Sequence, residues 1–204
     1  MGLIGVDKME ILKIFDENYK EIGLKSRDEV HQYGYFHEVF HCWVIQKIEE
    51  DWRIYFQLRS KYKKDYPGQF DISAAGHLLA TETVQDGVRE LAEELGLQAK
   101  FEDLTSLGVI VYKIEHENIK DYEYANVFIY KLKGSIKDFH LQEEELDGIF
   151  SASLVQFFKL VNGSCTHLQI EGYELLMGKR ILYKRKLHYR KWALYQWIIY
   201  RPLI

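Results

Sequence analysis

The sequence predicts an α/β domain, and three observations support this fold class. The first hundred residues contain several runs in which β-branched and aromatic residues alternate with polar ones, as in half-buried strands. Between residues 83 and 95 the apolar residues change to helical spacing. Strand-like runs then resume after residue 105, and a chain of 204 residues is long enough to bury one core without disulfides.

The first predicted strand covers residues 10–15, in which apolar and polar residues alternate. Asp16-Glu17-Asn18 follows it as a turn. Two further runs, at 41–46 and 52–58, are rich in β-branched and aromatic residues, and a charged link around residues 49–51 joins them. These two runs predict a β-hairpin.

A polar connector at 61–68 ends in a Pro-Gly turn and leads to the predicted helix at 83–95. Its apolar positions fall on one stripe, and Gly96 follows it as a C-cap glycine would. The residues of the stripe are Val84, Val88, Leu91 and Leu95.

Further strands are predicted at 105–112, 124–132 and 147–151, and a short helix at 154–160. We assign residues 1–165 to the main domain and residues 166–204 to a basic, aromatic, helical extension, in which leucine, isoleucine and tryptophan are mixed with lysine and arginine. Such an extension would pack on the domain or on a partner subunit, which predicts a homodimer. The alternatives for this extension are contact with an anionic surface or with single-stranded nucleic acid, and disorder.

Composition bounds the function. The formal net charge of −4 argues against nucleic acid as a partner. Cys42 and Cys165 form neither a zinc motif nor a disulfide framework. No run approaches the roughly 20 apolar residues of a membrane-spanning helix, and the N-terminus lacks the pattern of a signal peptide. We therefore expect a cytoplasmic protein without a membrane partner.

The predicted helix carries three carboxylates, Glu90, Glu93 and Glu94, at a spacing that places them along one edge. Three acids on one edge repel each other, and helix stability gives no reason for such an arrangement. A hard divalent cation does give one, because Mg²⁺ or Mn²⁺ takes oxygen ligands and bridges carboxylates to phosphates. The alternative interpretation is a solvated acidic face, since glutamate is a good helix former.

These acids belong to a longer pattern that resembles the signature of the Nudix family, G-x5-E-x7-R-E-U-x-E-E-x-G-U, where U is aliphatic. Nearly every fixed residue type occurs in order over residues 76–97. One departure is clear, because six residues, 83–88, separate Glu82 from Arg89 where the signature has seven. The matching residues are Gly76, Glu82, Arg89, Glu90, Leu91, Glu93, Glu94, Gly96 and Leu97.

The Nudix resemblance implies an α/β/α sandwich with a central mixed β-sheet, with the helix at 82–95 on one face and a helix near Leu154 on the other. It implies Mg²⁺ or Mn²⁺ at the helix carboxylates, with Arg89 holding an acid by a charge-assisted hydrogen bond. The substrate would be a small-molecule diphosphate, cleaved by an activated water. Glu93 or Glu94 would be the base, and the glutamates at 143–145 are further candidates.

Residues 10–160 also resemble type I isopentenyl-diphosphate isomerase, which has the Nudix fold. The resemblance rests on the histidine-rich segment 29–41, on Ala75-Gly76-His77 in place of a Cys-Gly-His unit, and on Asp121-Tyr122-Glu123. It implies a metal held by histidines and acids, although the spacing of the first two histidines differs from that family's. The implied metal set is His31, His37, His77, Asp121 and Glu123, and the implied diphosphate ligands are Arg59, Lys63 and Lys64.

Taken together, these resemblances predict a divalent-metal site and a catalytic group that share several residues. The predicted metal ligands are Gly76, His77, Glu90, Glu93, Glu94 and Glu123, and the predicted catalytic residues are Arg89, Glu93 and Glu94. His41 is interpreted as a strand residue, because Cys42 and Trp43 follow it.

Ala75 decides between the two activities that the resemblances imply. The isomerase uses the cysteine of its Cys-Gly-His unit for proton transfer, and a methyl side chain cannot transfer a proton. We therefore predict Mg²⁺- or Mn²⁺-dependent hydrolysis of a diphosphate linkage in a nucleoside diphosphate joined to another group. Two alternatives stay open: an isopentenyl-diphosphate isomerase-like enzyme, and a catalytically silent Nudix module that binds a ligand.

Overall fold

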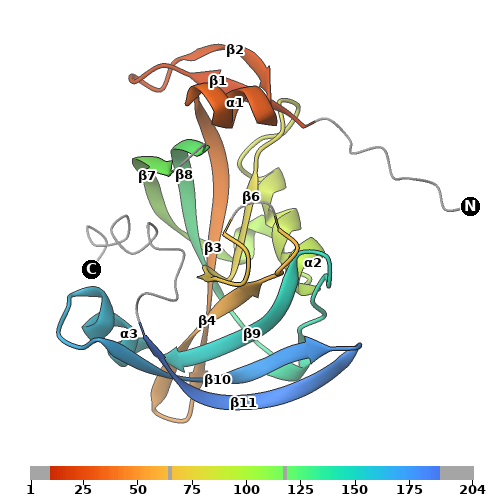
Figure 1. The fold of residues 1–204 in the computed structure, drawn as a ribbon, viewed down its shortest axis with the longest axis vertical. Coiled ribbons are helices and arrows are strands. Elements are labelled where there is room, and N and C mark those ends of the chain that lie inside the picture. The colour runs from red at the N-terminus through yellow and green to blue at the C-terminus, as the bar shows by residue number, and fades with distance from the viewer. Residues whose placement is uncertain (1–9, 64–65, 117–118, 189–204) are drawn as a thin grey trace, which may run out of the picture.

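One eleven-stranded sheet organises the protein, whose computed structural model describes residues 10–63, 66–116 and 119–188 (Figure 1). The strands are β1 (Ile11–Phe15), β2 (Glu21–Ser26), β3 (Phe36–Ile48), β4 (Asp51–Arg59), β5 (Phe70–Asp71), β6 (Ala74–His77), β7 (Leu104–His116), β8 (Ile119–Lys131), β9 (Leu146–Ser153), β10 (His167–Leu176) and β11 (Lys179–His188). The helices are α1 (Arg27–Tyr33), α2 (Arg89–Leu95) and α3 (Leu154–Val161), with 3-10 turns η1 (Asp86–Val88), η2 (Phe101–Asp103) and η3 (Ile136–Asp138).

Strand β3 is the centre of this sheet. It runs parallel to β8 over ten residue pairs, from Phe36↔Tyr122 to Ile45↔Lys131, and antiparallel to β1, β4 and β6. The sheet is therefore mixed, as predicted. The β3–β4 hairpin is also confirmed, since the two strands pair from Ile45↔Ile54 to Ile48↔Asp51.

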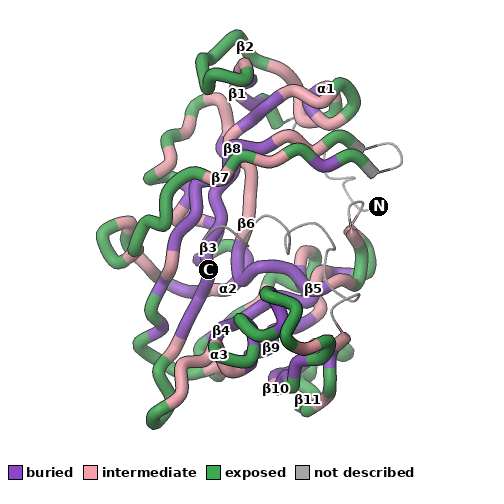
Figure 2. The backbone as a smooth tube through the Cα atoms, turned by 90° about the vertical axis from the view of Figure 1, so that its left-hand side faces the viewer, coloured by how far each residue is buried: buried purple, intermediate pink, exposed green. Residues whose placement is uncertain are grey.

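The two faces of β3 supply two separate cores. Phe40 and Val44 belong to the core that contains Leu91 of α2, whereas Trp43 belongs to the core that contains Phe157 of α3. Strand alternation produces this division, because successive side chains point to opposite faces. The predicted α/β/α sandwich is confirmed, and Figure 2 shows buried residues along the central strand β3 and exposed ones along the outer strands β2 and β11.

A seam between β3 and β4 positions the site described below. Beyond the pair Ile45↔Ile54 the two strands separate, and the short strands β5 and β6 occupy the space between them. The Ser73 hydroxyl bridges the seam: it accepts the Val44 N–H at 2.8 Å and donates to the Tyr55 carbonyl at 2.6 Å. The Ser73 side chain thus links β3 to β4 at Val44 and Tyr55, where the main chains of the two strands no longer pair.

The predicted helix at 83–95 begins later than expected. Residues 83–85 form a turn, in which the Asp86 carboxylate accepts the Thr83 N–H and hydroxyl, and η1 then leads into α2 at Arg89. The predicted end is correct, because Gly96 caps α2 in the left-handed conformation with φ 70°.

The predicted helical extension is wrong for residues 167–188, which form the strands β10 and β11 and the turn between them. These strands form an antiparallel hairpin, and β10 pairs with β9 of the main sheet. The turn is Met177-Gly178, with φ of 52° and 71°, and two positive φ values are the mark of a tight two-residue hairpin turn. Residues 189–204 of the predicted extension lie outside the described residues. In the described parts of the chain, no helix has the length and apolar character needed to cross a membrane.

Candidate functional site

Two of the three predicted helix acids face strand β6, and the third points outward. Glu90 and Glu94 are each 7% exposed, whereas the Glu93 side chain is 54% exposed. The Glu94 carboxylate accepts the Ala75 N–H at 3.1 Å. The Glu90 carboxylate lies directly against Gly76, where a Cβ atom would come within 2.0 Å of its Oε1, so only glycine leaves room for this acid.

Arg89 joins the acids of the predicted motif. Its guanidinium donates twice to Glu82, at 2.7 and 3.1 Å, and once each to Glu90 and Glu93, at 2.5 and 2.8 Å. It also donates to the His77 carbonyl at 3.1 Å, which ties α2 to the end of β6. Arg89 thus serves as a positioning residue for three acids at once.

The short connection between Glu82 and Arg89 does not prevent this arrangement. The 3-10 turn η1 enters α2 directly, so the chain reaches Arg89 with one residue fewer than the family signature. Gly87 makes the compact turn possible, because it lies against Phe40 and a Cβ atom there would come within 2.6 Å of that ring. Glu82 also accepts the Leu79 N–H at 2.8 Å.

Burial raises the pKa of both inward-facing acids. Desolvation raises the pKa of Glu90 to about 7, against the opposing charge of Arg89. Desolvation, together with the charge of Glu90, raises the pKa of Glu94 well above its usual range, although the Ala75 N–H and the Lys63 charge lower it. Two buried carboxylates that repel each other form a site that a divalent cation would stabilise.

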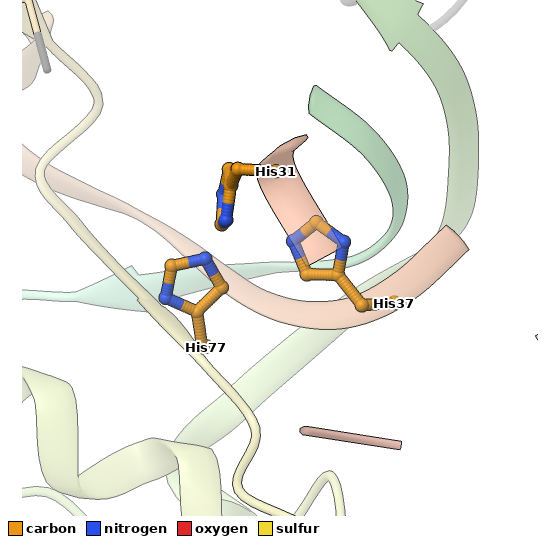
Figure 3. A group of neighbouring side chains, drawn as sticks. All are labelled: His31, His37 and His77. Atoms are coloured by element: carbon orange, nitrogen blue, oxygen red, sulfur yellow. The ribbon is translucent and has the colours of Figure 1, made fainter. Parts of the chain in front are cut away.

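Three histidines from three elements meet at the end of strand β6. His31 of α1, His37 of β3 and His77 of β6 each offer a ring nitrogen within 4.8 Å of the others. Figure 3 shows the three rings gathered around a common point. The ring centroids of His31 and His37 are 5.1 Å apart, and those of His37 and His77 are 5.2 Å apart.

Hydrogen bonds fix the orientation of two of these rings. Nδ1 of His31 lies 2.8 Å from the Arg27 carbonyl, and Nδ1 of His37 lies 3.1 Å from the Tyr35 carbonyl. A carbonyl accepts hydrogen bonds only, so each Nδ1 carries the proton and each Nε2 keeps its lone pair, as metal-binding histidines commonly do. Nε2 of His37 is buried and has no hydrogen-bond partner among the described residues.

Two acids of β8 complete the histidine group. Asp121 Oδ1 lies 3.6 Å from His31 Nε2 and 3.9 Å from His37 Nε2. Glu123, the register partner of His37, falls within 4.8 Å of His37 and Asp121 through one ligand atom each. The five residues that the isomerase resemblance implies as metal ligands therefore lie close together in the structure.

Tyr112 and His41, neither of which was predicted as a site residue, contact Glu123. The Tyr112 hydroxyl donates to Glu123 Oε2, and His41 Nε2 lies 3.6 Å from the same oxygen. Burial raises the pKa of Glu123 to about 8 and lowers the pKa of His41 to about 4. His41, interpreted above as a plain strand residue, is buried within the site and lies across from Ala75 in the β3–β6 pair.

The predicted diphosphate ligands Arg59 and Lys63 lie on the β4 side of the seam, at and just after the end of that strand. Arg59, at the end of β4, donates to Asp71 at 2.9 Å, and Lys63 forms an ion pair with Glu145. Lys64 lies outside the described residues. Asp71 was missed by sequence reasoning, although a single acid between Phe70 and Ile72 is the kind of buried charge that demands a partner.

The chain is similar to known Nudix proteins over most of its length. It is 37% identical over 164 residues to an uncharacterised Nudix hydrolase from Clostridium acetobutylicum, and the match covers 80% of each chain. It is 31% identical over 140 residues to an isopentenyl-diphosphate Δ-isomerase from Serratia proteamaculans, which covers 66% of this chain and 74% of that protein. No protein-family model matches the chain.

The fold resembles that of a solved MutT/nudix family protein from Enterococcus faecalis. The TM-score is 0.50, at 10% sequence identity, and the match covers 81% of this chain and 61% of the other. The sandwich is therefore shared even where the sequences have diverged.

Proposed function

The chain belongs to the Nudix hydrolase family, and on this premise we propose that it hydrolyses a diphosphate linkage in a nucleoside diphosphate joined to another group. The observation that carries the proposal is the pair Glu90 and Glu94, buried against Gly76 and Ala75 with Arg89 bonded to the neighbouring acids. Such a pair is unfavourable for a folded protein by itself, because two buried like charges repel and are desolvated.

A divalent cation fits the donor chemistry of this chain. Glu90 and Glu94 offer carboxylate oxygens, which suit Mg²⁺ or Mn²⁺, and we propose the carbonyl of Gly76, the residue against which Glu90 lies, as a further ligand. The histidine set with Asp121 and Glu123 offers mixed nitrogen and oxygen donors. The buried Nε2 of His37, which accepts no hydrogen bond from the part of the chain that the structure describes, supports this set as a second binding place. A bound cation would neutralise phosphate charge and make a coordinated water more acidic.

The side chains of this protein would then bind and orient the substrate. Arg89 keeps Glu82, Glu90 and Glu93 at fixed positions. Arg59 and Lys63 would bind the diphosphate oxygens, and Lys64, outside the described residues, is proposed with them. Glu94 or Glu93 would accept the proton of the attacking water; Glu94 is closer to strand β6, whereas Glu93 is half exposed and bound to Arg89.

A mixed incubation tests the reaction. The protein would be incubated with Mg²⁺, nucleotide sugars, ADP-ribose, dinucleotides and isopentenyl diphosphate, and followed by phosphorus and proton NMR. New phosphomonoester signals are expected, and they should be absent with an E90Q/E94Q double variant that remains folded. Intact diphosphate signals for every compound, with Mg²⁺ or with Mn²⁺, would contradict the proposal for these substrate classes.

A second candidate function is supported by the histidine set. His31, His37, His77, Asp121 and Glu123 are the residues that the isomerase resemblance implies, and an isomerase is among the relatives. Ala75 argues against it, because the chain lacks a thiol at that position. In the same incubation, an isomerase would convert the isopentenyl alkene protons while the diphosphate signals persist.

We also propose that the protein forms a homodimer. Size-exclusion chromatography with light scattering would distinguish a dimer from a monomer of 24.3 kDa.

A further inference from the structure

Asp71 is a buried acid that none of the family motifs above includes. It is 3% exposed and lies in β5, where it is the register partner of Gln57 in β4. Its neighbours anchor it firmly: Phe70 packs edge-on against Phe150 in the core, and Ile72 is fully buried. Because Phe70 points into the α3 core, strand alternation turns Asp71 to the opposite face, which is the face of α2.

Both oxygens of Asp71 have defined partners. Oδ1 accepts the Ile72 N–H at 2.7 Å, and Oδ2 accepts Nη1 of Arg59 at 2.9 Å. The Arg59 side chain is 15% exposed, and its main-chain N–H donates to the Gln69 carbonyl at 2.9 Å. Main-chain hydrogen bonds thus hold both residues of the ion pair, and Asp71 fixes one side of the guanidinium.

Asp71 also acts on the two groups of acids. Its negative charge contributes to the raised pKa of Glu94 and of Glu123, in each case after desolvation by burial. The Arg59 guanidinium is bonded to Asp71, whereas the Glu94 carboxylate accepts the Ala75 N–H.

We propose that Asp71 is a positioning residue that holds the Arg59 guanidinium in place to bind the diphosphate of the substrate. The inference rests on the proposed function, because it assumes that Arg59 binds diphosphate. A guanidinium has five N–H donors, so the bond to Asp71 is compatible with recognition of a phosphate by the same group.

The test is a double-mutant cycle of D71N, R59Q and the double variant. Calorimetry would measure the affinity of each protein for Mn²⁺ alone, and then for inorganic diphosphate in the presence of Mn²⁺. D71N should weaken diphosphate binding by about tenfold or more, as expected for loss of a charge-assisted bond. In the R59Q background the same change should have little further effect, because Asp71 acts through Arg59. In turnover assays D71N should raise KM more than it lowers kcat.

The matched control is E171Q. Glu171, in β10, forms an ion pair at 2.8 Å with Arg53, which lies on the same strand as Arg59, β4, but outside the seam. This variant should leave diphosphate binding unchanged. If D71N fails to fold, D71E takes its place, because it keeps the buried negative charge but changes the length of the side chain that holds Arg59. Weaker diphosphate binding is then expected, and undiminished binding would overturn the inference.

Each outcome has a distinct meaning. Wild-type protein that binds no inorganic diphosphate would overturn this inference through its premise that Arg59 is a diphosphate ligand, whereas the proposed function is decided separately by the NMR incubation. Wild-type binding that D71N leaves undiminished would overturn this inference alone. A loss of Mn²⁺ affinity that D71N causes equally in the R59Q background would make Asp71 a metal ligand, which also overturns the inference.

Discussion

At the scale of single residues, the site is defined by how close its acids lie to main chain. Glu90 lies against Gly76, Glu94 accepts a main-chain N–H, and Glu93 remains outside at 54% exposure. Three acids that look equivalent in the sequence therefore have different surroundings. The difference follows from the helix position, since only two of them face β6.

Substitution of the two adjacent acids should have different effects. E94Q should abolish tight Mn²⁺ binding and lower any turnover by roughly 10² or more, because a neutral amide cannot replace a buried carboxylate at a cation. E93Q should change Mn²⁺ affinity little, because Glu93 is half exposed and bound to Arg89. Calorimetric titration with Mn²⁺ measures both, and equal losses would assign both acids to the metal.

Gly76→Ala should separate binding from folding. The added methyl group would come within 2.0 Å of Glu90 Oε1, so the carboxylate must move, which a flexible side chain can do at small cost. We expect the melting temperature to change by only a few degrees while Mn²⁺ affinity falls roughly tenfold or more.

The control is Gly134→Ala in an exposed turn. Its methyl group would come within 2.1 Å of Asp138 Oδ2, so it displaces a carboxylate in the same way, but away from the site. Its Mn²⁺ affinity should equal that of the wild type. If both variants bound Mn²⁺ alike, Glu90 would have no role in the cation site.

At the scale of elements, the seam between β3 and β4 determines where the site forms. Ser73→Ala should leave the Val44 N–H buried without its partner and also remove the bond to the Tyr55 carbonyl. Loss of such a buried bond costs about 1–3 kcal/mol of unfolding free energy. Urea unfolding would measure it, and Ser164→Ala, in the loop before β10, is a control that should change stability little.

Elements with strong local patterns could be predicted from the sequence. The hairpin β3–β4, the end of α2 at Gly96 and helix α3 follow from periodicity and capping, which are local properties. Helix α1 was missed, although Ser26 and Glu29 form a capping box at its start. Strands β10 and β11 were read as helical because leucines and basic residues outweighed the single turn signal at Gly178.

The site could be predicted only in part, for a physical reason. The α2 acids lie close together in the sequence, so helix geometry groups them. The histidine set draws on α1, β3, β6 and β8, and only the family resemblance connected these residues before the sheet brought them together. Asp71 depends on a two-residue strand, which is too short to carry a periodic signal.

At the scale of the whole molecule, buried ionisable groups link stability to pH. In the protein without metal, burial raises the pKa of Glu90 to about 7 and of Glu123 to about 8, and lowers the pKa of His37 to about 3 and of His41 to about 4. The ordinary values are 4.5 for glutamate and 6.5 for histidine. The two kinds of group therefore act in opposite directions.

The sign follows from proton binding. The acids, whose folded pKa is raised, stabilise the fold below pH 4.5 and lose that contribution as pH rises to about 8. The histidines, whose folded pKa is lowered, stabilise the fold above pH 6.5 and lose that contribution as pH falls toward 3. Above about pH 7 the histidines are mostly neutral in both states, and only the acids still titrate.

We therefore expect the chelator-treated protein to lose thermal stability between about pH 7 and 8. Glu123→Gln should flatten this decline, because its side chain carries no charge to desolvate. Saturating Mn²⁺ should also reverse the decline, since a cation favours the ionised acids. Melting temperatures across this range, with and without Mn²⁺, provide the measurement; an unchanged slope in Glu123→Gln would exclude this acid as its source.

The Ser73 bridge makes one amide proton a reporter of the site. The Val44 N–H is bonded to a hydroxyl that lies two residues from Asp71 and three from Gly76, and not to a neighbouring strand. Its rate of exchange with deuterated water therefore records the opening of the seam, apart from unfolding of the sheet. A ligand that tightens residues 70–77 would slow that exchange, so occupancy could be followed without knowing which compound is bound.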